Sequence, residues 1–175
     1  MTHLQIKPYI TEEQLQKKVS EIGAEITKKF KGQQVVAVCV LKGSFIFYSD
    51  LIREVNADIN CEFFGVSSYH GSTSSGEVKV TLDLASPIEG KHVLLVEDIV
   101  DTGITMNYLK NSILSRKPAS LTTIALLEKP EALKVPCKLD YVGFQIANEF
   151  VVGYGLDYQG YYRNLPFIGQ VQNFQ

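Results

Sequence analysis

No apolar run in this sequence of 175 residues approaches the length of a membrane-spanning helix, and there is no internal repeat or low-complexity segment. The first ten residues lack the apolar segment of a signal peptide, so we expect none. The 17 basic and 19 acidic residues nearly balance, and the net charge of −2 argues against a strongly basic surface. We therefore expect a cytoplasmic protein with no nucleic-acid and no membrane partner.

Cysteine and histidine are scarce, and neither residue type shows the spacing of a metal site. The cysteines are odd in number, so we expect reduced, buried thiols rather than disulfides or zinc ligands. The histidines show no spacing suited to a catalytic triad either. The residues concerned are Cys39, Cys61, Cys137, His3, His70 and His92.

The remaining composition is that of a globular protein, 45% apolar and 21% charged, with enough residues for one domain with a sizeable core. Residues 11–31 predict an amphipathic helix, because Thr11 and Gln14 form a capping box and apolar residues then recur at helical spacing. Helical and strand patterns then alternate, which predicts an α/β fold with a mostly parallel sheet. The predicted strands are 35–41, 59–68, 78–84, 93–96, 121–127 and 141–144.

The stretch from Val93 to Thr105 has the strongest chemical pattern. An apolar run leads into Glu97 and Asp98, which we expect at the exit of a buried strand, where α/β sheets bind ligands. Neighbouring carboxylates repel unless vicinal hydroxyls or a cation share their charge. The Asp-Thr-Gly-x-Thr turn at 101–105 opens a helical pattern, so its backbone N–H groups can point at an anion. The stretch predicts a site for a sugar that carries a phosphate.

Cationic side chains follow two other predicted strands. Lys42, Gly43 and Ser44 come directly after residues 35–41, and we interpret this turn as a small anion-binding site. In it, glycine allows close backbone approach, serine donates a hydrogen bond and lysine adds a charge. Lys129 follows the strand at 121–127, so it lies on the same rim if the strands are parallel.

Two segments leave alternatives open. Residues 67–76 are rich in Gly and Ser, and they form either a flexible hairpin connection or an active-site lid with Tyr69 at its base. Residues 150–166 place glycines and tyrosines around Asp157 and Arg163. They either pack as a terminal strand and loop, which composition alone slightly favours, or surround a flat heterocycle beside a phosphate–metal site.

Residues 93–105 resemble the signature of type I phosphoribosyltransferases, enzymes that use 5-phosphoribosyl 1-pyrophosphate. The sequence departs from some members at Ile104, where they carry lysine. The resemblance covers about residues 35–167 and implies a single Rossmann-like domain over residues 1–175. It also implies a flexible lid hairpin at about 67–80 and a small hood, mainly 141–175 with the N-terminal residues. Segments 41–44, 68–69, 127–129, 150–158 and 162–166 are similar to the hypoxanthine (hypoxanthine–guanine) branch.

The resemblance implies roles for residues on the phosphoribosyl side. Asp101 is implied as the general acid or base at the purine, and Ser68 and Tyr69 as the residues that close over the reaction. The pyrophosphate is expected at Lys42, Gly43 and Arg163, and whether the Leu41–Lys42 peptide is cis stays open. The ribose and its 5′-phosphate are expected at Glu97, Asp98, Asp101, Thr102, Gly103, Ile104 and Thr105.

The resemblance also implies a purine site. Lys129 is expected to donate to the 6-oxygen, which excludes adenine because an ammonium cannot accept from an amine. Phe150 is expected to stack on the base, and Val151 to read its edge through backbone groups. Magnesium is the implied cofactor, ligated by Asp157 beside the purine, with Glu97 and Asp98 contributing only indirectly through the ribose.

The implied function is purine salvage, in which a 6-oxopurine base and phosphoribosyl pyrophosphate give IMP or GMP. A homo-oligomer, dimer or tetramer, is expected, and the preference between hypoxanthine and guanine stays open. One alternative is a sister transferase that prefers xanthine or guanine. Another is a phosphoribosyl-pyrophosphate-binding regulator of transcription, which the net charge of −2 disfavours. A dinucleotide-binding domain is disfavoured because no Gly-x-Gly-x-x-Gly turn is present.

Overall fold

The computed structural model of the protein describes residues 4–68 and 78–172. A central six-stranded sheet has the order β4-β3-β2-β5-β6-β7, and all neighbouring strands are parallel except β3 and β4. This arrangement confirms the mostly parallel sheet expected from the sequence. The strands are β2 (Gln34–Leu41), β3 (Asp58–Ser68), β4 (Val78–Leu82), β5 (His92–Val100), β6 (Ser120–Glu128) and β7 (Tyr141–Gln145).

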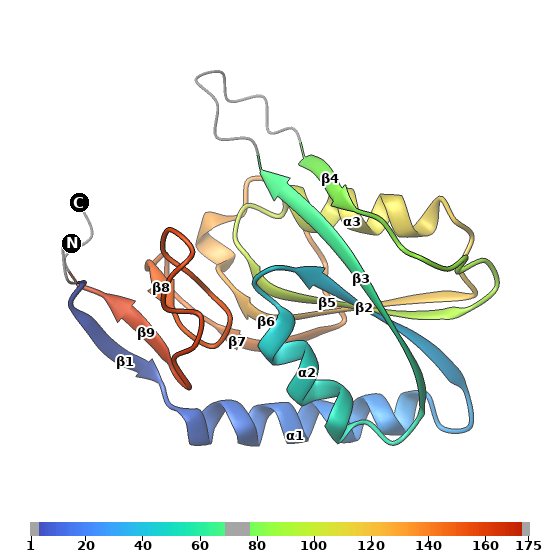
Figure 1. Ribbon diagram of the computed structural model, residues 1–175, viewed down its shortest axis with the longest axis horizontal. Coiled ribbons are helices and arrows are strands. Elements are labelled where there is room, and N and C mark those ends of the chain that lie inside the picture. The colour runs from blue at the N-terminus through green and yellow to red at the C-terminus, as the bar shows by residue number, and fades with distance from the viewer. Residues whose placement is uncertain (1–3, 69–77, 173–175) are drawn as a thin grey trace.

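Helices cover both faces of this sheet, with α1 (Glu12–Lys29) and α2 (Phe45–Glu54) on one face and α3 (Ile104–Leu114) on the other (Figure 1). A short 3-10 helix, η1 (Pro130–Ala132), follows β6. The capping box of α1 is confirmed, since Gln14 N donates to Thr11 Oγ1 at 3.2 Å. Within the described ranges, no helix is both long and apolar enough to cross a membrane.

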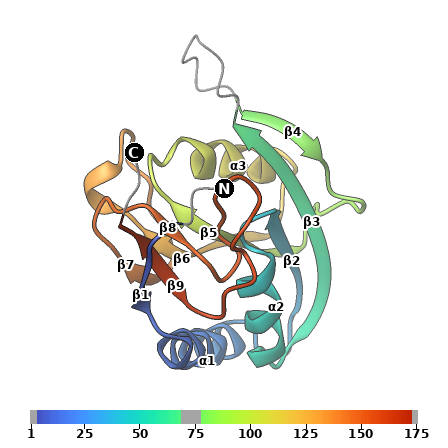
Figure 2. The ribbon, with the colours of Figure 1, turned by 60° about the vertical axis from the view of Figure 1, so that its left-hand side comes forward.

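A second, antiparallel sheet joins the two ends of the chain, with the order β1-β9-β8 (Figure 2). We call this sheet, with the loop 153–167 between β8 and β9, the hood, and the loop itself the hood loop. Residues 141–145, which the resemblance assigned to the hood, are β7 of the large sheet. The hood strands are β1 (Ile6–Ile10), β8 (Val151–Val152) and β9 (Ile168–Val171).

Two expectations about burial and strand length are wrong. β5 does not end at Val96, because β6 continues alongside it and Glu97 pairs with Ala125, so Glu97 lies inside the sheet with 7% of its surface exposed. Cys61 is exposed, as is Phe63 on the same face of β3, whereas Glu62 on the other face is buried. All three cysteines are free, and the other two are buried as expected.

Candidate active site

A cavity of about 480 Å³ opens where β2 and β5 end. It lies at the carboxyl ends of parallel strands, where open α/β sheets bind ligands. Most of the residues predicted for the phosphoribosyl side come together here. The polar residues and glycines that line it are Lys42, Gly43, Ser67, Glu97, Asp98, Asp101, Thr102, Gly103, Thr105, Asp157 and Arg163.

Glu97 and Asp98 both line the cavity, and their carboxyl groups interact with each other. Asp98 N donates to Glu97 Oε1 at 3.1 Å, and Ile99 N donates to Asp98 Oδ1 at 2.7 Å. Burial, together with the charge of Asp98, raises the pKa of Glu97 well above its ordinary value. Burial also raises the pKa of Asp98, although hydrogen bonds from Glu97 and Ile99 and the charge of Arg163 oppose this rise. The pair therefore retains a proton to higher pH than exposed carboxyls do, and a ligand that donates hydrogen bonds can take the place of that proton.

The turn at 101–105 presents the start of α3 to the cavity. Gly103 is the N-cap with φ 80°, and no side chain supplies a capping hydrogen bond there. Ile104 N donates to Thr102 Oγ1 at 3.4 Å, and Lys134 N donates to Thr102 O at 3.0 Å from the segment behind the turn. A Cβ at Gly103 would lie 2.8 Å from Val135 O, so the turn packs closely on that segment. Backbone N–H groups and the helix dipole together make this end of α3 suited to an anion.

The turn after β2 brings Lys42 and Gly43 to the cavity, and the Leu41–Lys42 peptide is cis. A Cβ at Gly43 would lie only 1.5 Å from Asp98 Oδ2, so no side chain fits there. A Cβ at Gly155 of the hood loop would lie 2.1 Å from Gly43 O. The backbone of Gly43 is thus enclosed between the β5 carboxylates and the hood loop.

Ser44 does not take the anion-binding role expected for it. It is fully buried, its hydroxyl donates to Val40 O at 2.5 Å, and it lies 3.3 Å from Cys39 Sγ. Ser44 already has helical backbone angles as the N-cap of α2, so its hydroxyl turns back to the preceding strand. The turn at 42–44 can therefore bind an anion through the charge of Lys42 and the backbone of Gly43, but not through the hydroxyl of Ser44.

Asp157 and Arg163 of the hood loop form an ion pair at the mouth of the cavity, with 2.6 Å between Nη2 and Oδ1. The other oxygen of Asp157 accepts from Gly160 N at 2.6 Å, and Arg163 Nη1 donates to Gly155 O at 2.6 Å. Among the described residues no group of three or more His, Cys, Asp or Glu could hold a metal ion. A magnesium ion here would take one protein carboxylate and draw its other ligands from a substrate and water, which is the usual arrangement for phosphate substrates.

Of the residues predicted for the purine side, Asp157 lines this cavity, whereas Lys129, Phe150 and Val151 are not among its lining residues. Lys129 is 8% exposed, and its Nζ is 4.0 Å from Oδ2 of Asp101, whose side chain is 50% exposed. The ring of Phe150 meets that of Tyr158 edge to face at 5.9 Å. Val151 is buried in β8, where it pairs with Gln170. Of these three residues, Lys129 at the exit of β6 is the one that the distances place next to Asp101.

The hairpin of β3 and β4 borders the cavity through Ser67. Ser68 ends β3 and pairs with Val78, whereas Tyr69 lies outside the described residues. The sequence placed Ser67 within the predicted lid but gave individual roles only to Ser68 and Tyr69, because a continuous polar stretch does not indicate which positions face a site. It also missed Tyr154, although the flanking Gly153 and Gly155 were a signal of unusual backbone there.

Comparison with known proteins agrees with this geometry. Residues 9–159 match the phosphoribosyl transferase domain family. The hypoxanthine-guanine phosphoribosyltransferase of Bacillus subtilis (strain 168) is 46% identical over 97% of this chain and 94% of its own length. That of Staphylococcus aureus (strain N315) is 48% identical over 93% of this chain and 92% of its own.

Solved structures agree as well. The hypoxanthine-guanine phosphoribosyltransferase of Bacillus anthracis superposes with a TM-score of 0.91 at 46% identity, over 97% of this chain and 100% of that one. The hypoxanthine phosphoribosyltransferase of Trypanosoma cruzi gives a TM-score of 0.91 at 43% identity, over 98% and 94%. Both comparisons extend over nearly the whole chain, so they include the hood as well as the sheet. The chain belongs to the phosphoribosyltransferase family, on its hypoxanthine-guanine branch.

Proposed function

We propose that this protein is a purine-salvage enzyme that transfers the 5-phosphoribosyl group of phosphoribosyl pyrophosphate to hypoxanthine, guanine or both. The products are IMP or GMP and pyrophosphate. The observation that carries the proposal is that one cavity unites a buried carboxylate pair, the uncapped start of α3 and two cationic side chains. Its volume of about 480 Å³ is in the range of small-molecule sites.

Within the proposed reaction, the β5 end holds the sugar. Glu97 and Asp98 accept hydrogen bonds from the ribose hydroxyls, which favour the charged carboxylates and so oppose the burial that raises their pKa values. The N–H groups at 102–105, with the hydroxyls of Thr102 and Thr105, bind the 5′-phosphate. Ile104 contributes its backbone to this site, so the difference from family members with lysine there leaves phosphate binding intact.

The opposite side of the cavity receives the leaving pyrophosphate. Lys42 and Arg163 neutralise its charge, and Gly43 lets it approach the backbone closely. Asp157 would hold the magnesium ion. When bound, that ion supplies further positive charge for the departing pyrophosphate. Departure leaves an electron-poor ribosyl carbon, which the purine attacks from the other face, and Ser67, Ser68 and Tyr69 exclude water.

The purine binds beside Asp101. Asp101 exchanges a proton with the imidazole-ring nitrogen that forms the new glycosidic bond, and its half-exposed carboxylate is free enough to do so. Lys129 donates to the 6-oxygen, and the 4.0 Å between Lys129 Nζ and Asp101 Oδ2 puts the two groups within the span of one purine. Phe150 stacks on the base and Val151 presents backbone groups to its edge.

One assay tests the proposal. The purified protein is incubated with Mg²⁺, phosphoribosyl pyrophosphate and, in turn, hypoxanthine, guanine, xanthine and adenine, and nucleotide formation is measured. We expect turnover with hypoxanthine or guanine and none with adenine. A clear preference for xanthine would favour the sister transferase. Binding of phosphoribosyl pyrophosphate without turnover of any base would favour the regulator.

We also propose a location in the cytoplasm and a homo-oligomer, dimer or tetramer. The three free cysteines support a reducing compartment. The oligomeric state of the Trypanosoma cruzi relative has been studied, and the oligomeric state of this chain can be measured in the same way. Light scattering on a size-exclusion column tests it, and a single peak at the monomer mass, 19.5 kDa, would rule out the oligomer.

A further inference from the structure

Tyr154 has an unusual backbone and a buried side chain that the proposed reaction does not use. Its φ is 50°, between Gly153 at 99° and Gly155 at 103°, so three consecutive residues adopt the left-handed region. Tyrosine adopts that region only at an energetic cost, which the surrounding structure has to offset. The side chain is 5% exposed and lines a cavity of about 340 Å³ beside α1 and α2, separate from the active-site cavity.

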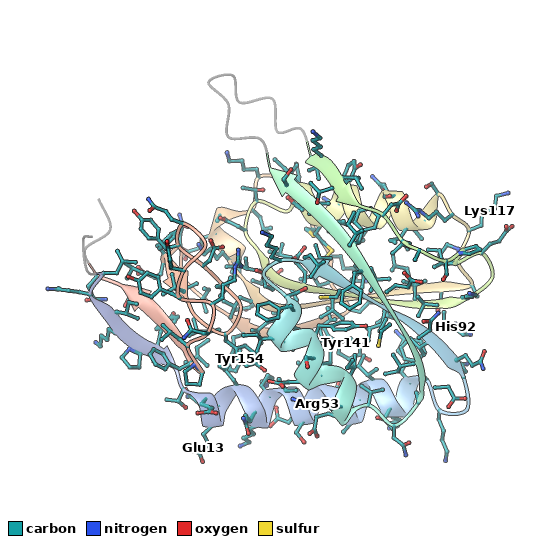
Figure 3. All side chains as sticks on the ribbon, viewed as in Figure 1. Glu13, Arg53, His92, Lys117, Tyr141 and Tyr154 are labelled. Atoms are coloured by element: carbon teal, nitrogen blue, oxygen red, sulfur yellow. The ribbon has the colours of Figure 1, made fainter. Side chains whose placement is uncertain are left out.

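The hydroxyl of Tyr154 ties the hood loop to α2. It donates to Asp50 Oδ2 at 2.6 Å, and the same carboxylate pairs with Arg53 one turn later on the helix. Figure 3 labels Tyr154 and Arg53 where the hood meets α2. Burial and this hydrogen bond both raise the pKa of the Tyr154 hydroxyl, so it stays a donor at physiological pH.

The backbone next to Tyr154 reaches the leaving-group side of the active site. Gly155 packs on the carbonyl of Gly43, where a Cβ would come within 2.1 Å. Gly155 N donates to Arg163 O at 3.0 Å, and Gly155 O accepts from Arg163 Nη1 at 2.6 Å. A continuous series of contacts therefore runs from Asp50 of α2 through Tyr154 and Gly155 to Gly43 and Arg163.

We propose that Tyr154 and Asp50 form a positioning pair that holds the hood loop in register with the Lys42–Gly43 turn. The pair thereby fixes the site of the pyrophosphate group, without touching substrate. The purine side depends on it less, since the backbone of Phe150 and Val151 is held by β9, where Val171 N donates to Phe150 O at 2.9 Å and Val151 pairs with Gln170. The ring of Phe150 meets the hood loop at Tyr158. This inference rests on the proposed function and adds a residue pair that governs one of its two substrates.

The test compares two tyrosine-to-phenylalanine variants on the full protein. Tyr154→Phe removes only the hydroxyl that reaches Asp50. We expect the KM for phosphoribosyl pyrophosphate to rise roughly tenfold, which is the size of one lost hydrogen bond to a charged acceptor. The KM for hypoxanthine should stay within about twofold, because the purine side is held by β9.

The matched control is Tyr48→Phe, which also removes a buried hydroxyl at α2. Tyr48 donates to Ala37 O at 3.0 Å, on a contact that does not involve the hood. This variant should lower the melting temperature as much as Tyr154→Phe does and leave both KM values unchanged. A purely structural role for Tyr154 would make the two variants behave alike.

Substitutions of Asp50 test the pair from the other side and serve if Tyr154→Phe does not fold. Asp50→Ala removes the acceptor and should reproduce the tenfold rise. Asp50→Asn keeps a carbonyl oxygen that accepts from the tyrosine, so it should restore a KM close to that of the unsubstituted protein. An Asp50→Ala variant with an unchanged KM for phosphoribosyl pyrophosphate would overturn the pairing.

The positioning role and the proposed function fail in different ways. Turnover by the unsubstituted protein, together with equal KM values in Tyr154→Phe and Tyr48→Phe, overturns only the positioning role. Binding of phosphoribosyl pyrophosphate without turnover overturns the proposed function. The tenfold effect of Tyr154→Phe is then sought in the dissociation constant for phosphoribosyl pyrophosphate, measured by calorimetry. Neither turnover nor binding by the unsubstituted protein overturns both.

Discussion

The two sides of the active-site cavity are built in different ways. The sugar-phosphate side comes from one continuous segment, 97–105, in which the end of β5 leads directly into α3. The leaving-group side comes from segments far apart in the chain, since Lys42 and Gly43 follow β2 whereas Asp157 and Arg163 belong to the hood loop. The two sides meet at Gly43, which touches Asp98 and Gly155.

This difference determines how each side resists change. A continuous segment keeps its internal geometry as long as the strand and the helix around it are intact. The other side depends on contacts between backbone segments, such as Gly155 on Gly43, that exist only after the hood has packed. Substitutions on the sugar-phosphate side should therefore change the chemistry or the charge of the site. Substitutions on the leaving-group side should change how closely the two sides of the cavity pack.

The largest effect is expected from Asp101→Asn, within the continuous segment. The amide cannot exchange a proton with the purine, so kcat should fall by roughly two to four orders of magnitude while the KM for phosphoribosyl pyrophosphate changes little. Steady-state kinetics with hypoxanthine measure both constants. Asp83→Asn is the control, because Asp83 is an exposed aspartate that pairs with Arg116 outside the site. Unchanged turnover in Asp101→Asn would remove Asp101 as the acid or base.

The next effect is expected at the junction of the two sides. In Gly43→Ala the new Cβ would overlap Asp98 Oδ2, so either Asp98 or the turn has to move. We expect kcat/KM for phosphoribosyl pyrophosphate to fall by about two orders of magnitude, since displacements near 1 Å cost that much. Gly90→Ala is a control with open space around its Cβ and a positive φ of 70°, so it should affect stability alone. Equal kinetics in both variants would show that Gly43 tolerates a side chain.

A smaller effect is expected from Lys129→Ala, beside the purine. Loss of the ammonium removes the donor for the 6-oxygen, so the ratio of kcat/KM for adenine to that for hypoxanthine should rise by at least about tenfold. Competition assays with the two bases measure this ratio. Lys110→Ala is the control, because Lys110 Nζ donates to Lys138 O at 2.8 Å outside the cavity. If adenine stays as strictly excluded as before, another residue reads the base.

The smallest effect is on stability and concerns Glu97. Its pKa is raised on folding, so above the ordinary value of 4.5 the unfolded chain binds fewer protons than the folded protein does. The free energy of unfolding therefore falls as pH rises from that value to the raised one. Glutamine does not ionise, so Glu97→Gln removes this loss of stability at high pH. The variant should raise the melting temperature at pH 8 by about 2–4 °C, the shift that ~1 kcal/mol gives in a chain of this size.

The same reasoning gives the pH dependence that checks this prediction. The difference in melting temperature between Glu97→Gln and the unsubstituted protein should shrink toward zero as the pH is lowered to about 4.5. Glu89→Gln, in an exposed turn, is the control. A difference that does not depend on pH would mean that Glu97 does not carry the proton. Because Glu97 also binds the ribose in the proposed reaction, the more stable variant should bind phosphoribosyl pyrophosphate less well.

Much of the fold could be predicted because its signals are local. The capping box at Thr11 and the apolar run of β2 depend on residues that are neighbours in the sequence, and both are confirmed. Predictions failed where a contact from elsewhere decided the outcome. Pairing with β6 extends β5 beyond Val96, and the hydroxyl of Ser44 donates to Val40 O of β2. The spacing of apolar residues within one segment predicts neither contact, because each contact is made with a residue outside that segment or outside its repeating positions.

The sequence by itself determined the sugar-phosphate segment, because the order of strand, carboxylates, glycine turn and helix fixes that geometry over a few residues. Only the tertiary structure decided that Gly43 fits between Asp98 and Gly155, and that Tyr154 reaches Asp50 more than a hundred residues earlier in the chain. The physical reason is that such contacts form between backbone segments brought together by sheet and hood packing. Their distances follow from the packed fold as a whole, whereas the signature from Val93 to Thr105 is readable from adjacent residues alone.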